Sequence, residues 1–177
     1  MARELALHAL SPAPEVTEAL GERLGRALVP GALLALVGEL GSGKTTLVRG
    51  LARGLGVEEA VASPTFTRMR ALPGRLALYH FDAWRGGAES LFEEGGEFLS
   101  GEGVGVVEWA DRVAAALPRP RLQLELRHRG EGLRELLGRL VPAEPGTAGR
   151  ALALERALAA ALEGAAATPG LEHLPDA

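Results

Sequence analysis

A glycine-rich octapeptide, Gly38–Thr45, constrains this chain more than any other segment. Its sequence, GELGSGKT, matches the phosphate-loop pattern G-x-x-x-x-G-K-[ST] at every position. An unbroken apolar run, Ala32–Val37, precedes it, and a segment with apolar residues at helical spacing, 44–55, follows it. A buried strand, a loop and an amphipathic helix in this order predict an α/β fold of the P-loop NTPase type. We expect a mostly parallel central sheet with antiparallel edge strands, flanked by helices.

Each position of the loop has a chemical reason. Glycines allow successive backbone N–H groups to point inward around a phosphate, and the following helix adds the positive end of its dipole. Lys44 can place a compact ammonium against the terminal phosphates, and Thr45 can offer its hydroxyl to Mg²⁺. Lys44 is the only lysine among 19 basic residues, which indicates that arginine does not suffice at this position. The alternative, a chance glycine turn, predicts no particular strand before it.

Two carboxylates follow predicted strands. Asp82 comes after Leu76–Phe81 and Glu108 after Val104–Val107, so both are expected at the carboxyl edge of the sheet, where α/β proteins bind ligands. A P-loop needs an acidic partner for Mg²⁺ at this edge. The alternatives are a helix N-cap for Asp82 and a surface acid capping the next turn for Glu108.

Three other features near this edge each have two possible interpretations. His80 faces the same side of its strand as Asp82, and a structural role is the plainer interpretation. Trp109 could stack on a base or belong to the core. The segment Ser63-Pro64-Thr65-Phe66 could orient a water or contact the γ-phosphate, or it could form a capped turn.

The rest of the chain supplies the remaining elements. Further strands are expected at 4–10, shortly before Ser63, at 66–70 and at 122–127, and a helix is expected from Ser11-Pro12 onward. Residues 86–103 predict a mobile loop around one short helix. Over 130–140 two interpretations compete, because Gly130-Glu131-Gly132 could turn a hairpin whereas Leu133, Leu136, Leu137 and Leu140 have helical spacing.

The chain divides into two predicted segments. Residues 1–142 form the P-loop domain, and 143–177 form an alanine-rich extension with a linker, one helix at 151–162 and a frayed tail. The absence of cysteine excludes disulfides and Cys-based metal sites. A net charge of -4 argues against broad nonspecific nucleic-acid binding. No apolar run approaches the ~20 residues of a membrane span and no signal-peptide pattern is present, so a cytoplasmic protein is expected.

Four motifs in a fixed order resemble the TsaE family, the small ATPases of bacterial tRNA threonylcarbamoyladenosine biosynthesis. They are Gly38–Thr46, Ser63–Phe66, the hexapeptide HFDAWR at 80–85, and Val107-Glu108-Trp109. The resemblance covers roughly residues 5–130. It departs from the family at Trp84, where a tyrosine is usual, and after Trp109, where Ala110-Asp111-Arg112 replaces the usual P-E-R.

The resemblance implies an activity, cofactors and partners. A TsaE-like protein binds Mg·ATP, acts on a complex of the TsaD and TsaB type, meets tRNA only indirectly, and is expected to be monomeric when isolated. Asp82 and Lys44 are the implied catalytic residues, and Thr45 and Glu108 the metal ligands. The nucleotide-contacting residues are expected to be Thr17, Glu39, Leu40, Gly41, Ser42, Gly43, Lys44, Thr45 and Thr46. A small-molecule P-loop kinase is the alternative, with Arg127, Arg129, Arg134 and Arg139 as its phosphate-clamping arginines.

Overall fold

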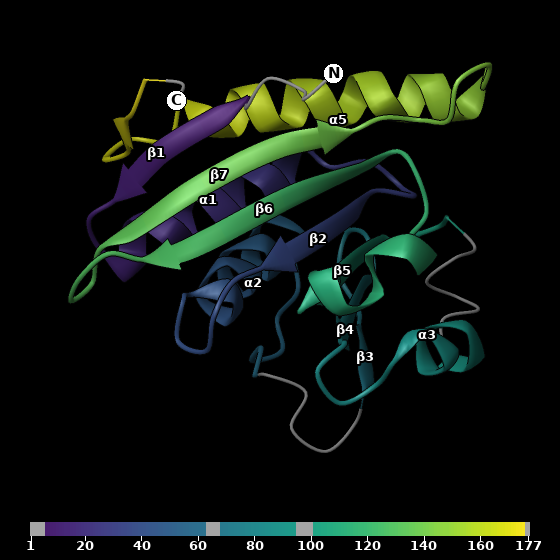
Figure 1. The fold of residues 1–177 in the computed structure, drawn as a ribbon, viewed down its shortest axis with the longest axis horizontal. Helices are drawn as coiled ribbons and strands as arrows, with labels where there is room; N and C mark the ends of the chain where they lie inside the picture. The colour runs from purple at the N-terminus through teal and green to yellow at the C-terminus, as the bar shows by residue number, and fades with distance from the viewer. Residues whose placement is uncertain (1–5, 63–67, 95–100, 176–177) are drawn as a thin grey trace.

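A computed structural model describes residues 6–62, 68–94 and 101–175 and places all of its strands in one eight-stranded sheet, in the order β3-β4-β5-β2-β6-β7-β1-β8 (Figure 1). The strands are β1 (Leu7–Ser11), β2 (Leu33–Val37), β3 (Met69–Leu72), β4 (Leu78–Asp82), β5 (Val104–Glu108), β6 (Arg121–His128), β7 (Arg134–Val141) and β8 (Glu172–His173). The four central strands β4, β5, β2 and β6 are parallel, and the remaining pairings are antiparallel. This confirms the predicted fold class.

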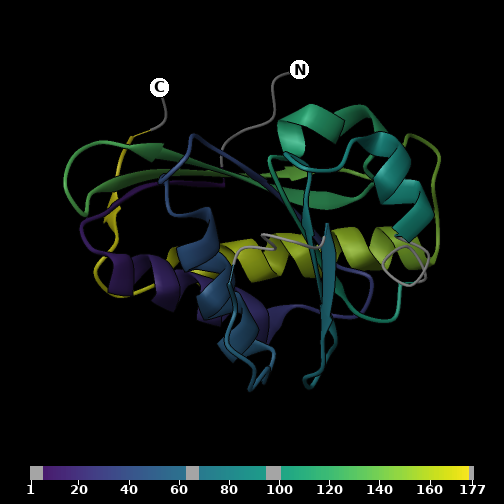
Figure 2. The ribbon, with the colours of Figure 1, turned by 90° about the horizontal axis from the view of Figure 1, so that it is seen from below.

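Helices lie on both faces of the sheet (Figure 2). On one face lie α1 (Pro14–Ala27), α2 (Lys44–Gly54) and α5 (Arg150–Ala166), and on the other lie α3 (Ala88–Glu94) and the 3₁₀ helix η1 (Ala110–Ala116). Side chains alternate between the two cores, as a strand requires. Leu34 and Leu36 of β2 join the larger core under α1, α2 and α5, whereas Leu33 and Ala35 join the smaller one. No helix in the described part of the chain is long and apolar enough to cross a membrane.

Glycines bring α1 and α2 into backbone contact. A Cβ atom added to Gly21 or Gly25 of α1 would lie 2.2 Å from Leu47 O or 2.3 Å from Leu51 O. On α2, a Cβ at Gly50 would lie 1.9 Å from Glu18 O. Any side chain at these positions would therefore force the helices apart. The contact holds α2, whose first residue is Lys44, at a fixed place above the sheet.

The helix α2 ends in a turn that depends on a glycine, Gly56. Gly56 adopts a φ of +73°, and its N–H donates to Arg53 O while the N–H of Val57 donates to Ala52 O. This pair of hydrogen bonds is a Schellman motif, which a residue with a side chain would form less readily.

The structure decides one open alternative and corrects three expectations. Residues 134–141 form strand β7 and the hairpin interpretation is confirmed, because this segment pairs along its whole length with β6. The predicted helix near Ser11-Pro12 begins two residues later, at Pro14. No strand lies in 57–62, the described residues before Ser63. The expectation of a frayed tail is wrong for Glu172 and His173, which form β8 and pair with β1.

The predicted C-terminal segment contributes to the larger core. The helix α5 buries Leu158, Ala161, Leu162 and Ala165 in the core that also contains Leu20 and Leu24 of α1. The division of the chain at residue 142 stays a prediction.

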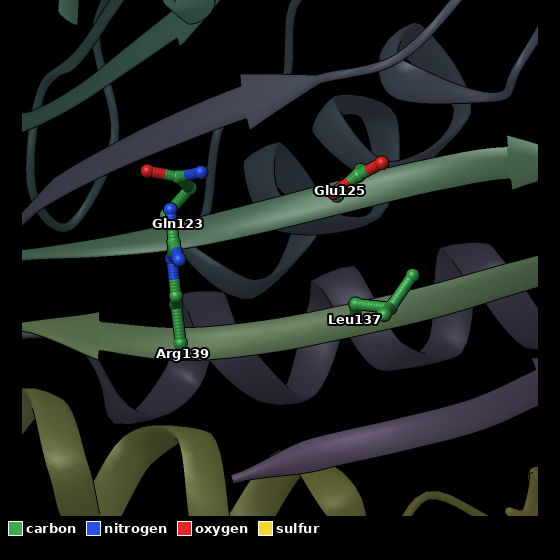
Figure 3. A pocket seen from close by; sticks show the side chains of 4 residues that line it. All are labelled: Gln123, Glu125, Leu137 and Arg139. Carbon is green, nitrogen blue, oxygen red and sulfur yellow. The ribbon is translucent and has the colours of Figure 1, made fainter. Parts of the chain in front are cut away.

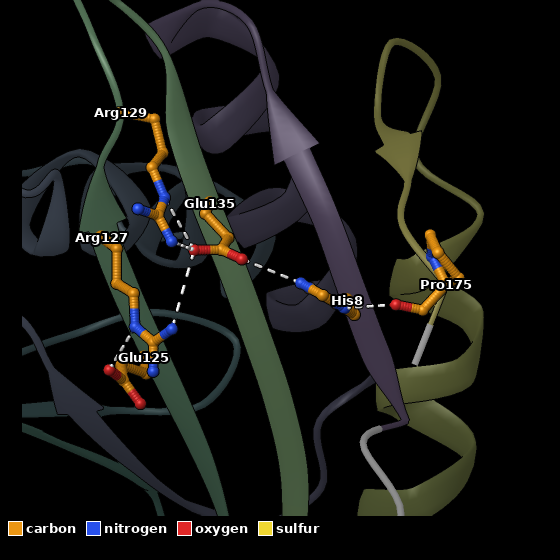
Figure 4. Close-up of polar contacts among 6 residues, drawn as sticks. All are labelled: His8, Glu125, Arg127, Arg129, Glu135 and Pro175. Carbon is orange, nitrogen blue, oxygen red and sulfur yellow. Dashed lines mark hydrogen bonds and ion pairs between the residues drawn. The ribbon is translucent and has the colours of Figure 1, made fainter. Parts of the chain in front are cut away.

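A buried carboxylate links the strands at the antiparallel side of the sheet (Figure 4). Glu135 of β7 accepts hydrogen bonds from Arg129 Nε at 2.9 Å and from Arg129 Nη2, and its Oε1 lies 2.9 Å from His8 Nε2. His8 Nδ1 in turn lies 3.0 Å from Pro175 O, which ties the end of the chain to β1. The contact with His8, together with Arg129 and Arg127, lowers the pKa of Glu135 although burial opposes this shift.

We predict that Glu135→Gln lowers the free energy of unfolding at pH 7 by roughly 1–3 kcal/mol, because His8, Arg129 and Arg127 lose a buried, charged acceptor. The folded-state pKa of Glu135 lies below the unfolded value, so its contribution is present above about pH 4.3 and is lost as the pH falls through the lowered pKa. Urea unfolding at several pH values should show less acid dependence in the variant than in the parent. Glu125→Gln is the control, since the Glu125 side chain is 34% exposed and should change stability by less than ~1 kcal/mol.

Candidate functional site

The phosphate loop joins the end of β2 to the start of α2 at the carboxyl edge of the parallel strands. Gly43, the residue before α2, has a φ of +101°, a conformation that side chains disfavour. At Gly38 a Cβ atom would lie 2.3 Å from Leu126 O on the neighbouring strand β6. The glycines of the motif are therefore required both by loop geometry and by the close approach of β6.

The ammonium of Lys44 lies inside the loop. It donates to Gly38 O at 2.7 Å and Glu39 O at 2.8 Å, and it lies 4.0 Å from the ring centroid of Trp109. Burial lowers the pKa of Lys44, and three nearby carboxylates counter this shift only in part; these are Glu108, Asp82 and Asp111. A partly desolvated ammonium interacts more strongly with an anion than one in water does.

Thr45 and Glu108, the two residues predicted to bind the metal, meet beneath the loop. The Thr45 hydroxyl donates to both carboxylate oxygens of Glu108, at 3.2 and 3.4 Å. Glu108 is almost fully buried at the end of β5, and its other neighbour is His80, whose Nε2 lies 2.8 Å from Oε1. The alternative of Glu108 as an exposed surface acid is wrong.

Asp82 lies beside Glu108, because the two residues are register partners on the parallel strands β4 and β5. Its Oδ1 accepts a hydrogen bond from the Trp84 backbone N–H at 2.9 Å. The chain continues from Asp82 into a turn rather than a helix, so the residue is not a helix N-cap. The negative charge of Asp82 acts to raise the pKa of Lys44. Asp82 does not line the cavity described next.

A cavity of about 270 Å³ opens over the loop. Its lining includes Glu108 and seven of the predicted nucleotide-contacting residues, Leu40, Gly41, Ser42, Gly43, Lys44, Thr45 and Thr46. Two other predicted contacts, Thr17 and Glu39, are not among the described residues that line the cavity. Thr17 is buried, and its hydroxyl lies 2.8 Å from Ser11 Oγ.

Two further residues line this cavity: Arg134, which the sequence offered only as a phosphate clamp of the kinase alternative, and Trp109, whose role it left open. Arg134, at the start of β7, donates from Nη2 to Gly41 O at 3.0 Å, so it reaches the loop from 93 residues away in the chain. No local signal distinguishes it from the other arginines. Trp109 lines the cavity as well and adopts a left-handed backbone conformation, with a φ of 58°.

Aromatic rings extend the site outward from Lys44. The ring centroids of Trp109 and Trp84 are 4.8 Å apart, and the guanidinium of Arg112 lies 3.8 Å from the centroid of Trp84. The core interpretation of Trp109 is therefore incomplete, since the ring packs between the smaller core and a cation of the loop. The segment Ser63–Phe66 lies outside the described residues.

The residues at this site fit a nucleotide with Mg²⁺. Within the described ranges no group of three or more His, Cys, Asp or Glu side chains could hold a metal. Mg²⁺ needs no such group, because it is commonly bound by one or two protein oxygens together with substrate phosphates and water. Thr45 Oγ1 and the Glu108 carboxylate supply hard oxygen ligands of this kind next to the loop.

The parallel sheet, the loop between β2 and α2, and the acidic residue on β5 define a P-loop NTPase-like fold. The family model described as "Threonylcarbamoyl adenosine biosynthesis protein TsaE" matches residues 11–136. The chain belongs to the TsaE family, which functions in tRNA threonylcarbamoyladenosine biosynthesis.

Individual relatives agree with this assignment. The chain is 41% identical to the tRNA threonylcarbamoyladenosine biosynthesis protein TsaE of Treponema pallidum, over 73% of this chain and 98% of the relative. It is also 41% identical to TsaE of Bacillus subtilis, over 70% of this chain and 78% of the relative. The crystal structure of Bacillus subtilis YdiB superposes with a TM-score of 0.65 at 34% identity, covering 87% of this chain and 94% of that one.

We predict that Lys44→Ala lowers the affinity for ATP by ~10²-fold or more, because the loop keeps its amides but loses the charge closest to the phosphates. Titration calorimetry measures this directly. Thr45→Ala provides the contrast, since it should weaken the effect of Mg²⁺ on binding more than binding in EDTA. Undiminished affinity in Lys44→Ala would remove the phosphate-loop interpretation.

Proposed function

We propose that this protein is a Mg²⁺-dependent ATPase that supports N6-threonylcarbamoyladenosine formation at position 37 of tRNA by acting on a TsaD–TsaB-type complex in the cytoplasm. The observation that carries the proposal is the meeting of Lys44, Thr45 and Glu108 at one phosphate loop. Membership of the TsaE family supports the place of this chemistry in tRNA modification.

The residues that bind nucleotide have distinct tasks. The loop amides from Gly41 to Thr45 donate hydrogen bonds to the phosphates, and Lys44 neutralises their charge. Thr45 and Glu108 hold Mg²⁺, directly or through water. When bound, Mg²⁺ offsets negative charge on the phosphate oxygens. The ring centroid of Trp109 lies 4.0 Å from the Lys44 ammonium, and the ring contributes a cation–π contact.

Asp82 is the residue proposed to act on the attacking water. It is buried, its carboxylate lies on the strand next to Glu108, and one of its oxygens is fixed by the Trp84 N–H. A held carboxylate can orient a water and accept its proton. Asp82 thus acts in hydrolysis, whereas Glu108 acts in binding.

The arginine that reaches the cavity is committed to backbone contacts. Arg134 donates from its two terminal nitrogens to the carbonyls of Gly41, Gly130 and Leu133. It therefore stabilises the loop rather than projecting freely toward a transferred phosphoryl group. Arg85, three residues past Asp82, is exposed and is the candidate for becoming ordered when a partner binds.

Exposed apolar side chains at the site support a protein partner. Leu40, at the crest of the loop, is 90% exposed, and Trp84 is 55% exposed beside Trp109. Large apolar side chains exposed next to a functional cavity are typical of a contact surface. The net charge of -4 fits a protein that reaches tRNA through protein partners.

The kinase alternative loses support because its four arginines do not converge. Arg127 and Arg129 pair with Glu125 and Glu135. Arg139 lines a separate hollow of about 210 Å³ on the uncovered face of β6 and β7, with Gln123, Glu125 and Leu137 (Figure 3). Of the four, Arg134 alone lines the cavity over the loop. A phosphorylated small-molecule acceptor in a direct assay would revive this alternative.

The deciding experiment is a pull-down of a purified TsaD–TsaB pair with this protein, with ATP, with ADP and without nucleotide. We expect association that depends on the nucleotide and is lost in Lys44→Ala. Association that ignores both nucleotide and variant would contradict the proposal.

We predict that Asp82→Asn leaves the affinity for ATP within a few-fold of the parent while hydrolysis falls by about 10²-fold or more, because the amide keeps the size of the side chain but cannot accept the proton. Glu108→Gln should instead weaken Mg²⁺-dependent binding. Calorimetry and phosphate release measure the two effects. If Asp82→Asn loses affinity and Glu108→Gln binds normally, the two roles are reversed.

We further predict slow ATP hydrolysis by the isolated protein and faster hydrolysis with a TsaD–TsaB pair. A suitably placed arginine is worth about 10³–10⁵ in rate for phosphoryl transfer, and Arg134 is held by carbonyls. Steady-state phosphate release with and without partners measures the difference, and the Lys44→Ala protein corrects for contaminating activity. Rapid hydrolysis by the chain alone, unaffected by partners, would refute this.

A further inference from the structure

A histidine with no assigned role lies directly behind the proposed magnesium ligand. His80 is on β4, two residues before Asp82, and its side chain is fully buried. Its Nε2 lies 2.8 Å from Oε1 of Glu108, whose side chain is only 4% exposed. The two groups come from neighbouring parallel strands, so the sheet itself fixes their separation.

The direction of this hydrogen bond follows from the chemistry of its partner. An ionised carboxylate only accepts hydrogen bonds, so Nε2 of His80 carries the hydrogen and donates it. The second ring nitrogen, Nδ1, is buried and has no hydrogen-bond partner within the described residues. Burying a polar atom without a partner costs free energy, and an apolar side chain could fill the same space without that cost. The donor at Nε2 is the one polar contact that His80 makes there.

Glu108 is thus held from two sides. The Thr45 hydroxyl approaches both of its oxygens from α2, while His80 donates to Oε1 from β4. Donation from His80 limits rotation of the carboxylate about its own axis and keeps it aligned with Thr45. Groups that orient a metal ligand in this way contribute to metal affinity without touching the metal.

We propose that His80 is a positioning residue that orients the Glu108 carboxylate for Mg²⁺ binding. The inference rests on the proposed function only in taking Mg²⁺ with ATP as the ligand of this site. It assigns His80 no contact with the nucleotide and no part in proton transfer.

Two amide variants test the proposal with a matched control. In His80→Gln the amide nitrogen is as many bonds from Cβ as Nε2 is, so a donor to Glu108 is kept. In His80→Asn the same amide is one bond shorter and corresponds to Nδ1, so the donor is withdrawn. His80→Leu removes the donor at similar volume.

The measurement is the Mg²⁺ concentration that half-saturates the binding of a fluorescent ATP analogue, alongside the affinity of the same analogue in EDTA. We expect this concentration to rise by about 10-fold or more in His80→Asn and His80→Leu, and to stay within ~2-fold of the parent in His80→Gln. The affinity in EDTA should be the same in all four proteins. A purely structural role would lower thermal stability without this separation of the glutamine variant from the others.

Equal Mg²⁺ requirements in all four proteins would overturn the proposal, as would a glutamine variant that behaves like the leucine variant. If a variant fails to fold, ¹⁵N spectra of the four histidines in the parent decide the point. We expect a hydrogen on Nε2 of His80, and an Nε2 without one would overturn the proposal. A parent protein that binds no ATP would instead overturn the proposed function.

Discussion

The backbone contact between α1 and α2 fixes the geometry on which the candidate site depends. Glycines on both helices allow an approach that no side chain would permit, so α2 has one available position above β2. Since α2 begins at Lys44, the same contact determines where the Thr45 hydroxyl meets the Glu108 carboxylate of β5. A methyl group added far from the cavity, at Gly50 for example, would therefore displace the residues that bind phosphate and metal.

The charged groups around Lys44 at this edge all come from different elements. One ammonium from α2 faces the carboxylates of β4, β5 and η1, and burial strengthens their mutual attraction. The tryptophans then separate this charged centre from solvent on one side. The arrangement explains why lysine persists at position 44 in a chain that otherwise uses arginine: a guanidinium is larger and could not be enclosed by the same two carbonyls and ring.

The sequence predicted the elements whose signals are local. The strand before the loop, the helix after it, and Asp82 and Glu108 at strand ends follow from apolar runs and the motif, and the structure places them together. It could not separate helix from strand at β7, because Leu136 and Leu140 are four apart and share a face in either structure; pairing with β6 decides. The reach of Arg134 to Gly41, and the contact of His80 with Glu108, depend on sheet order, which spacing along the chain does not contain.

The short strand β8 has a consequence for how the molecule meets copies of itself. Without β8, β1 would be an edge strand with unpaired backbone N–H and C=O groups. Strands of other chains can pair with such an edge and form aggregates. This edge is covered by the two residues of β8, which pair with β1, and by the Pro175 carbonyl, which is hydrogen-bonded to His8. The opposite border, β3, is only four residues long and carries Arg70. The tail of the chain thus acts as a guard against intermolecular strand addition, a protective task separate from anything that happens at the phosphate loop.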